Sequence, residues 1–167
     1  LQVAMGAFRE ALATQREIDK VIHQMEAEYS EDLMHKLSAL QEKFERLDGY
    51  TIQSKAEEVL EGIGFQTADL QRPLRTFSGG WRMRVMLAKL LLEKPSLLML
   101  DEPTNHLDLP SIEWVENYLR NYEGAVMVVS HDRTFLNNVT TRTIEVANQK
   151  LTAYEGNYDY YLDEKEL

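Results

Sequence analysis

Two adjacent carboxylates follow an apolar segment in the second half of the chain. Asp101 and Glu102 come directly after residues 97–100, Leu-Leu-Met-Leu, and Pro95 and Pro103 stand on either side of this stretch. An apolar run bounded in this way is typical of a buried strand. A carboxylate at a strand tip can hold Mg²⁺, usually through water, and its neighbour can take the proton from an attacking water. The pair predicts a metal-assisted hydrolytic site; the structural alternative is a salt-bridged strand end.

A second group of polar residues follows the next apolar run. His131 and Asp132 come after the continuous segment AVMVVS, residues 125–130. A histidine in such a place is ordinarily a surface or capping residue. The carboxyl ends of parallel strands, however, meet at one edge of the sheet, and open α/β sheets bind ligands there. We therefore expect His131 to lie beside Asp101 and Glu102 on one rim.

A serine and two glycines open a further helix. Ser78, Gly79 and Gly80 precede an apolar-periodic segment that runs to about Glu93. Glycines at a helix start leave backbone N–H groups accessible at the positive end of the helix dipole, which suits a phosphate. The alternative is an ordinary turn.

The elements that would position these residues alternate between strand and helix. Strands are expected at 97–101 and 125–130, and the helix between them begins near Pro110 and ends before Gly124. Its expected buried stripe consists of Ile112, Val115, Leu119 and Tyr122. Strand, helix and strand in this order predict a parallel α/β core.

The end of the chain predicts a hairpin and a last helix. Residues 143–146 and 151–154 are short strand-like segments joined by Ala-Asn-Gln-Lys, which favours an antiparallel hairpin. An exposed helix is expected after it.

The first third of the chain is helical in pattern. Residues 1–47 predict two antiparallel helices zipped along an apolar seam, with Ser30 as the N-cap of the second. The seam of the first helix is expected at positions 1, 4, 8, 11, 15, 18, 22, 25 and 29. A third helix is expected from a cap at Thr51 to Gly62 or Gly64, with an inner stripe of Ile52, Ala56, Val59, Leu60 and Ile63. The helical pair is ordinarily a packing arm, and a partner-binding surface is the functional alternative.

Composition narrows the function classes. The net charge is −10, and residues 1–76 and 77–167 each hold 14 acids and 9 bases, which argues against either half being a general nucleic-acid surface. The chain has no cysteine, which excludes disulfides and thiolate metal sites, and no apolar run approaches transmembrane length. Because the first residue is Leu1, we expect a piece of a longer protein.

Three motifs in order resemble those of the ATP-binding-cassette (ABC) ATPases. FSGGWRMR (77–84) resembles the signature, LLMLDEPTNHLD (97–108) resembles Walker B and the D-loop, and VVSHDRTFL (128–136) resembles the H-switch. EPTNHLD and the Trp after SGG are most similar to the ABC-F branch, which has two ATPase domains per chain and no membrane domain. The final YEGNYDYYLDEKEL resembles the end of the first cassette of that branch.

The resemblance implies a role for each matching residue. Asp101 would act in Mg²⁺ coordination, Glu102 would polarise the attacking water, and His131 would contact the γ-phosphate of ATP. The D-loop, which faces the opposing cassette, would be Asn105, His106, Leu107 and Asp108. The signature, which binds the γ-phosphate held by that cassette, would be Ser78, Gly79 and Gly80.

The resemblance also implies partners for the whole protein. Members of the ABC-F branch are cytoplasmic, pair two cassettes, and typically couple ATP turnover to translation on the ribosome near the tRNA sites. Some confer resistance to ribosome-targeting antibiotics.

The phosphate-gripping loop is missing from the 167 residues. No segment matches G-x-x-x-x-G-K-[ST]. We therefore expect the C-terminal portion of a first cassette, in which the chain alone does not hydrolyse ATP. The strand that would neighbour AVMVVS is absent too, so we expect the chain to self-associate through an exposed sheet edge.

The fold expected is a partial P-loop NTPase of ABC type, an α/β parallel-sheet core preceded by a helical subdomain. The segments are a helical arm (1–47), a signature subdomain (48–94), a partial ATPase core (95–156) and the start of a linker helix (157–167).

Three other interpretations stay open. A chromosome-organising ATPase of the structural-maintenance type would also lack the phosphate loop on its C-terminal lobe, although the helical part here is short for one. The ATPase subunit of a membrane transporter shares the motif set but fits EPTNHLD and SGGW less well. A helical interaction module would make the motifs relics.

Overall fold

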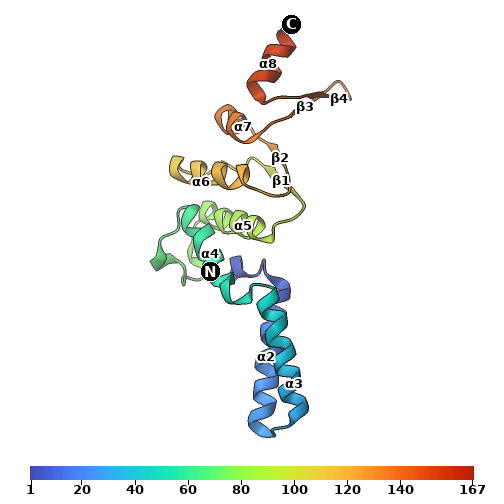
Figure 1. Ribbon diagram of the computed structural model, residues 1–167. Helices are drawn as coiled ribbons and strands as arrows, with labels where there is room; N and C mark the ends of the chain where they lie inside the picture. The colour runs from blue at the N-terminus through green and yellow to red at the C-terminus, as the bar shows by residue number, and fades with distance from the viewer. The chain divides into compact units, whose positions relative to one another are not determined.

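A computed structural model describes residues 1–167, which form two compact units (Figure 1). The first unit comprises Leu1–Glu61 and Phe65–Glu93. The second comprises Gly62–Gly64 and Lys94–Leu167. No helix in the chain is both long enough and apolar enough to cross a bilayer.

The first unit begins with the expected helical pair. After the short α1 (Gln2–Met5), helices α2 (Arg9–Ala27) and α3 (Glu31–Arg46) lie side by side, blue to cyan in Figure 1. Ser30 is confirmed as the N-cap of α3, because its hydroxyl accepts a hydrogen bond from the Leu33 N–H at 3.1 Å. This bond satisfies one of the donors that every helix start leaves unpaired.

The expected seam of the first helix was partly wrong. Ile22 and Tyr29 are exposed (40% and 63%), whereas Thr14 and Val21 are buried. A strict 3.5-residue repeat drifts by about 20° per heptad on a straight helix, so a seam extrapolated over many turns leaves the buried face. The chain also breaks between α1 and α2, so the seam does not run along one helix. The core of this region comprises Ala11, Ile18, Phe44 and Ile52.

Two longer helices complete the first unit. Helix α4 (Ile52–Gly62) buries four residues of the stripe expected for it, and the fifth, Ile63, is buried just beyond the end of the helix. Helix α5 (Gly79–Glu93) begins and ends where the pattern predicted. Between them stand the single 3₁₀ turns η2 (Thr67–Asp69) and η3 (Leu74–Thr76).

Thr51 does not cap α4 as expected. It ends the 3₁₀ turn η1 (Gly49–Thr51), and its hydroxyl donates to the Asp48 carbonyl at 2.8 Å. A hydroxyl that bonds backward along the chain is a local alternative to capping the helix ahead.

The second unit contains the parallel strands. Strand β1 (Leu97–Asp101) and strand β2 (Ala125–Val129) form a two-stranded parallel sheet, in which Asp101 lies opposite Val129. Helix α6 (Leu109–Arg120) connects them, as the strand–helix–strand pattern predicted. The α/β fold class with a parallel sheet is confirmed.

The stripe of α6 was predicted only in part. Val115 and Leu119 are buried, but Ile112 is half-buried and Ser111 and Glu116 are buried instead. The fourth predicted residue, Tyr122, lies beyond the end of the helix, where its hydroxyl donates to the Pro95 carbonyl. The buried polar residues have partners, such as the Asn138 amide that donates to Glu116 at 3.1 Å, so their burial is tolerated.

The remaining elements are short. Helix α7 (Arg133–Val139), which was not predicted, follows β2. Strands β3 (Thr143–Ala147) and β4 (Lys150–Tyr154) form the expected antiparallel hairpin, and α8 (Tyr158–Glu166) ends the chain.

Candidate active site

The carboxyl ends of β1 and β2 bring three predicted residues to one edge of the sheet. The parallel register ends with Asp101 opposite Val129. Glu102 is therefore the first residue beyond β1, and His131 is the second beyond β2. Because the strands run in the same direction, residues 29 positions apart in sequence become neighbours.

Glu102 is the best-defined member of this group. One carboxylate oxygen lies 3.4 Å from the backbone N–H of His131, and the other contacts Nδ1 of the His131 ring. The Glu102 side chain is 26% exposed and the His131 side chain 95% exposed. The contact thus joins a largely shielded carboxylate to an imidazole that faces solvent.

The backbone at Glu102 is held in a costly conformation. Its φ is 48°, in the left-handed region, which costs a non-glycine residue about 1–2 kcal/mol. The Glu102 N–H donates to the Val129 carbonyl at 2.7 Å, which continues the ladder between the strands by one bond. This bond holds the Glu102 backbone beside the end of β2. Strained residues of this kind cluster at functional sites.

His131 lies in a turn that is closed by the next residue. The Asp132 carboxylate caps α7 by accepting from the Phe135 N–H at 3.0 Å, and the Asp132 N–H donates to the Ser130 hydroxyl at 3.0 Å. Phe135 is completely buried. The turn that carries His131 is therefore fixed to the core through Phe135, although the imidazole itself is exposed.

Asp101 ends β1 with an exposed side chain. No group of three or more His, Asp or Glu side chains gathers in the chain to hold a metal ion. A Mg²⁺ ion bound at Asp101 would thus take most of its ligands from water and from phosphate. A single exposed carboxylate is compatible with Mg²⁺, which usually keeps several waters and binds through one or two carboxylates plus substrate phosphates.

The predicted D-loop forms two tight turns directly after Glu102. The Asn105 N–H donates to the Glu102 carbonyl at 3.2 Å, and the Leu107 N–H donates to the Thr104 carbonyl at 3.1 Å. His106 has a φ of 66°, and both Asn105 and His106 are exposed. Because the first turn begins at Glu102, this loop is hydrogen-bonded to the carboxylate residue itself.

Asp108 closes the loop at the start of α6. It is the residue before the helix, and its carboxylate contacts the hydroxyl of the buried Ser111. The same hydroxyl lies 3.0 Å from the carbonyl of Ile63. Asp108 is thereby tied to α6 at the end of an otherwise exposed loop.

The three signature residues belong to the first unit, not to the unit that contains Glu102. The Ser78 carbonyl accepts from the Arg82 N–H at 3.0 Å, which starts α5, and Ser78 and Gly79 are exposed. A Cβ added at Gly79 would meet no atom within 4 Å. The fold of this chain therefore has no packing need for glycine at that position. The backbone amides at the start of α5 are accessible to an anion.

The signature turn has aromatic neighbours to which its sequence motif gives no role. Phe77 and Trp81 flank it, and both rings contact the buried ring of Phe65, with centroids 5.5 and 4.9 Å away. The available signal was that two large aromatic residues stand four positions apart on either side of two glycines. Phe77 is extended and lies before α5, so the two rings meet through their common contact with Phe65 and not through helix geometry.

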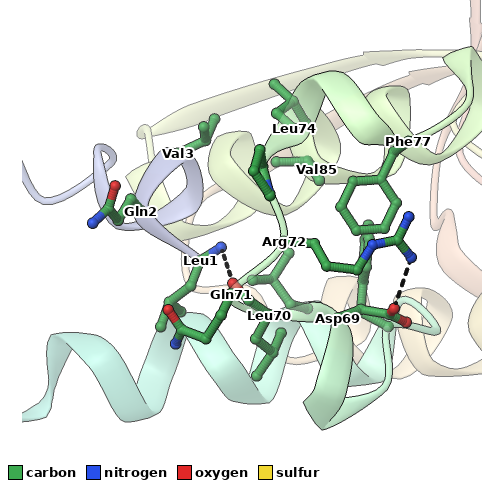
Figure 2. Close-up of a pocket in the computed structure, with 13 residues that line it drawn as sticks. Leu1, Gln2, Val3, Asp69, Leu70, Gln71, Arg72, Leu74, Phe77 and Val85 are labelled. Carbon is green, nitrogen blue, oxygen red and sulfur yellow. Dashed lines mark hydrogen bonds and ion pairs between the residues drawn. The ribbon is translucent and has the colours of Figure 1, made fainter.

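A cavity of about 260 Å³ adjoins this turn within the first unit (Figure 2). Figure 2 shows Arg72 lying against the ring of Phe77 and reaching toward Asp69. The guanidinium is 4.2 Å from the ring centroid, and its Nη1 is 3.0 Å from the Asp69 carboxylate. Apolar side chains that line it include Leu60, Phe65, Leu70, Leu74 and Val85, although about half of the cavity surface is polar.

Comparison with known protein families gives one match. The model described as ABC transporter matches residues 5–105. This range contains the signature turn, the Asp101–Glu102 pair and Asn105, the first residue of the predicted D-loop.

Curated relatives resemble nearly the whole chain. The uncharacterized ABC transporter ATP-binding protein YfmM of Bacillus subtilis is 40% identical over 99% of this chain and 32% of its own length. The energy-dependent translational throttle protein EttA of Mycobacterium tuberculosis is 42% identical over 88% of this chain and 26% of its own length. The ATP-binding cassette sub-family F member 2 of Mus musculus is 42% identical over 97% of this chain and 25% of its own length. The chain thus spans between a quarter and a third of these relatives.

Solved structures share the fold. A bacterial ABC transporter cassette determined as a dimer has a TM-score of 0.53 and 23% identity, over 64% of this chain and 48% of that one. Its post-hydrolysis state with ADP and Pi gives a TM-score of 0.53 and 24% identity over the same shares.

Proposed function

The chain belongs to the ABC transporter family, and from this premise we propose that it supplies the hydrolytic edge and the signature turn of one cassette in an ABC-F type ATPase. The observation that carries the proposal is the contact between Glu102 and His131 at the carboxyl ends of two parallel strands. Ligands of open α/β sheets bind at this edge.

Glu102 is the general base of the proposed reaction. Its carboxylate accepts the proton of the water that attacks the γ-phosphate of ATP, a role generally worth about 10²–10⁴-fold in rate. His131, exposed beside it, contacts the γ-phosphate and holds the water and phosphate in line. Positioning of this kind supplies much of the rate enhancement in phosphoryl transfer.

Asp101 is the residue proposed to hold Mg²⁺ through its water shell. The ion supplies positive charge that offsets the charge of the phosphate oxygens. Asp101 itself orients the metal-bound waters at the strand tip next to Glu102.

The signature turn and the D-loop face a second cassette in this proposal. The amides of Ser78, Gly79 and Gly80 bind the γ-phosphate of the nucleotide held by that cassette. The open space at Gly79 supports this role, because a phosphate can approach the backbone there without meeting a side chain. The opposing cassette is contacted by the D-loop, which consists of Asn105, His106, Leu107 and Asp108. Because the first turn of this loop begins at Glu102, a change at the contact can move Glu102.

Four segments divide this work. The proposed division is a helical arm (1–47), a signature subdomain (48–94), a partial ATPase core (95–156) and the start of a linker helix (157–167).

We further propose that the whole protein couples ATP turnover to translation by binding the ribosome. The support is the name of one relative, a translational throttle protein, together with its 42% identity to this chain. The 167 residues alone do not hydrolyse ATP, since no phosphate-gripping loop is among them and a base without bound substrate accelerates nothing.

Two measurements test the proposal. The wild-type full-length protein is expected to hydrolyse ATP. Its Glu102→Gln variant, which is expected to stay in the ATP-bound state, should sediment with ribosomes. The 167-residue chain is expected to show no Mg²⁺-dependent turnover and no ATP binding at micromolar concentration. Turnover by the short chain would contradict the division of labour, and an unchanged rate in full-length Glu102→Gln would remove Glu102 from the base role.

A further inference from the structure

The signature turn is flanked on both sides by residues that pack on a single ring. Phe77 precedes Ser78 and Trp81 follows Gly80, and both rings contact Phe65 edge to face. The interplanar angles are 82° and 65°, and edge-to-face pairs at these distances are favourable beyond the area they bury. Phe65 is itself 5% exposed, so it belongs to the core of the first unit.

The turn between these aromatic residues is the first turn of α5, begun by the hydrogen bond from the Arg82 N–H to the Ser78 carbonyl, and its glycines add no side-chain packing to it. Gly79 has no side chain, is exposed, and has no atom within reach of an added Cβ. Glycine also loses more backbone freedom on ordering than any other residue. The backbone amides of this turn point along the start of α5, and the packing of the residues at its two ends fixes where that start lies.

Two arginines cover the rings that flank the turn. The guanidinium of Arg72 lies 4.2 Å from the centroid of Phe77, and that of Arg84 lies 4.2 Å from the centroid of Trp81. Cation–π contacts of this kind add to the packing of the rings.

These arginines belong to a basic segment within an acidic chain. Residues 70–92 contain five bases and no acid, although the net charge of the chain is −10. The bases are Arg72, Arg75, Arg82, Arg84 and Lys89. The segment that surrounds the turn thus favours an anion, even though Asp69 offsets the charge of Arg72.

We propose that Phe65 is a positioning residue for the signature turn. Its ring holds Phe77 and Trp81, and through them it aims the amides of residues 78–80 at the γ-phosphate of the nucleotide bound by a second cassette. The inference deepens the proposed function and rests on it. Phe65 does not touch the nucleotide, so it acts only through the turn.

The chain offers a matched control for removal of a buried ring. Phe44 is also 5% exposed, lies in the same unit, and makes an edge-to-face contact with Tyr50 at 4.8 Å. Its ring pairs with neither Phe77 nor Trp81. Phe44→Leu and Phe65→Leu therefore remove similar packing, but only the second acts on the turn.

The experiment compares steady-state hydrolysis by the full-length protein and its variants. Phe65→Leu is expected to lower kcat at least tenfold, while ATP binding measured without turnover stays within twofold. Phe65→Tyr, which keeps the ring, is expected to restore most of the rate, and Phe44→Leu is expected to keep the wild-type rate. A merely structural role would move both Leu variants alike and would overturn the proposal.

A second variant covers the case in which Phe65→Leu does not fold. Trp81 is only half-buried, so Trp81→Leu removes one ring contact and leaves the core ring in place. It is expected to lower kcat and to shift the amide NMR resonances of Gly79 and Gly80. Wild-type kcat and wild-type amide resonances in this variant would overturn the inference. If Glu102→Gln also leaves hydrolysis unchanged, the proposed function fails; if only the aromatic variants are silent, the inference fails alone.

Discussion

The carboxylate of Glu102 meets His131 at two atoms, the backbone N–H at 3.4 Å and the ring Nδ1. The two residues are held by different strands, and the hydrogen bond from the Glu102 N–H to Val129 ties their strand ends together. The imidazole is almost fully exposed, so this carboxylate is the chief contact that orients it. The base and the phosphate-contacting residue of the proposed reaction thus form a hydrogen-bonded pair.

The first prediction concerns the Glu102–His131 pair in the full-length protein. Glu102→Gln is expected to lower kcat by about 10²–10⁴-fold, and His131→Ala by a similar factor. The double variant is expected to be no slower than the more impaired single variant, because residues that act together are strongly non-additive. Steady-state hydrolysis of the four proteins measures the coupling.

A surface carboxylate provides the control for this cycle. Glu155 pairs with Arg142 at the base of the β3–β4 hairpin, so Glu155→Gln removes a carboxylate outside the site and is expected to keep the wild-type rate. Losses that simply multiply in the Glu102 and His131 double variant would show that the two residues act separately.

The second prediction separates stability from function at two glycines. Gly79→Ala is expected to leave the free energy of unfolding unchanged or to raise it by about 0.4–1 kcal/mol, because the new methyl group meets nothing. ATP hydrolysis by the full-length protein should nevertheless fall, because that methyl group stands where the phosphate approaches. Denaturant titration and kcat together give the two readouts.

Gly62 is the matched opposite of Gly79. A Cβ at Gly62 would lie 2.1 Å from the Trp114 ring, so Gly62→Ala is expected to destabilise the fold by about 1–3 kcal/mol. Full hydrolysis by Gly79→Ala would argue against a phosphate at that position. Full stability of Gly62→Ala would contradict the packing of Trp114.

The third prediction concerns self-association of the 167-residue chain. The β1–β2 sheet has only two strands, so each strand has an unpaired edge. One face of the sheet is also apolar and exposed through Leu97, Met99, Met127 and Val129. Unpaired edges beside an exposed apolar face recruit other chains, so light scattering should show an apparent mass that rises with concentration.

Substitution of two exposed methionines distinguishes association through this sheet from nonspecific hydrophobic association. Met99 on β1 is 64% exposed and Met83 on α5 is 63% exposed. Met99→Lys is expected to shift the chain toward monomer, whereas Met83→Lys is expected to leave association unchanged. A wild-type chain that stays monomeric at all concentrations would contradict the prediction.

The fourth prediction is that acid detaches α8 from β3. Hydrogen bonds from Lys165 and Tyr161 lower the pKa of Glu145 below its ordinary value. A carboxylate whose pKa is lower in the folded state stabilises that state above its unfolded pKa, about 4.3, and loses the effect as the pH falls through the folded pKa. The protection of the α8 amides relative to their intrinsic exchange rate should therefore fall below about pH 4.

A second acidic residue acts in the same direction on α8. Hydrogen bonding by Asn137 and then by Arg133 lowers the pKa of Asp159. Glu145→Gln is expected to lower the protection of the α8 amides already at neutral pH. In this variant the further loss of protection in acid should be smaller, because only Asp159 still contributes to it. Protection of the α8 amides that stays constant as the pH falls would show that these contacts do not hold the helix.

Elements with strong local signals were predicted well. The apolar runs of β1 and β2 and the helix α5 stand where the pattern placed them. Helix α7 was missed because seven residues span barely two turns, and only Phe135 within them is fully buried. A period of 3.6 residues cannot be recognised over so short a stretch. The buried face of α2 was misplaced because small errors in phase accumulate along a long helix.

The residue types that carry the proposed chemistry were determined by the sequence itself. Asp101 and Glu102 at a strand tip and two glycines at a helix start are local patterns, and local backbone preferences suffice to produce them. The partners of these residues were decided only by the tertiary structure. Glu102 meets His131 because a parallel register joins two strand ends, and Phe65 meets Phe77 and Trp81 because the chain turns back after α4. Contacts between distant residues depend on how whole elements pack, which no local pattern encodes.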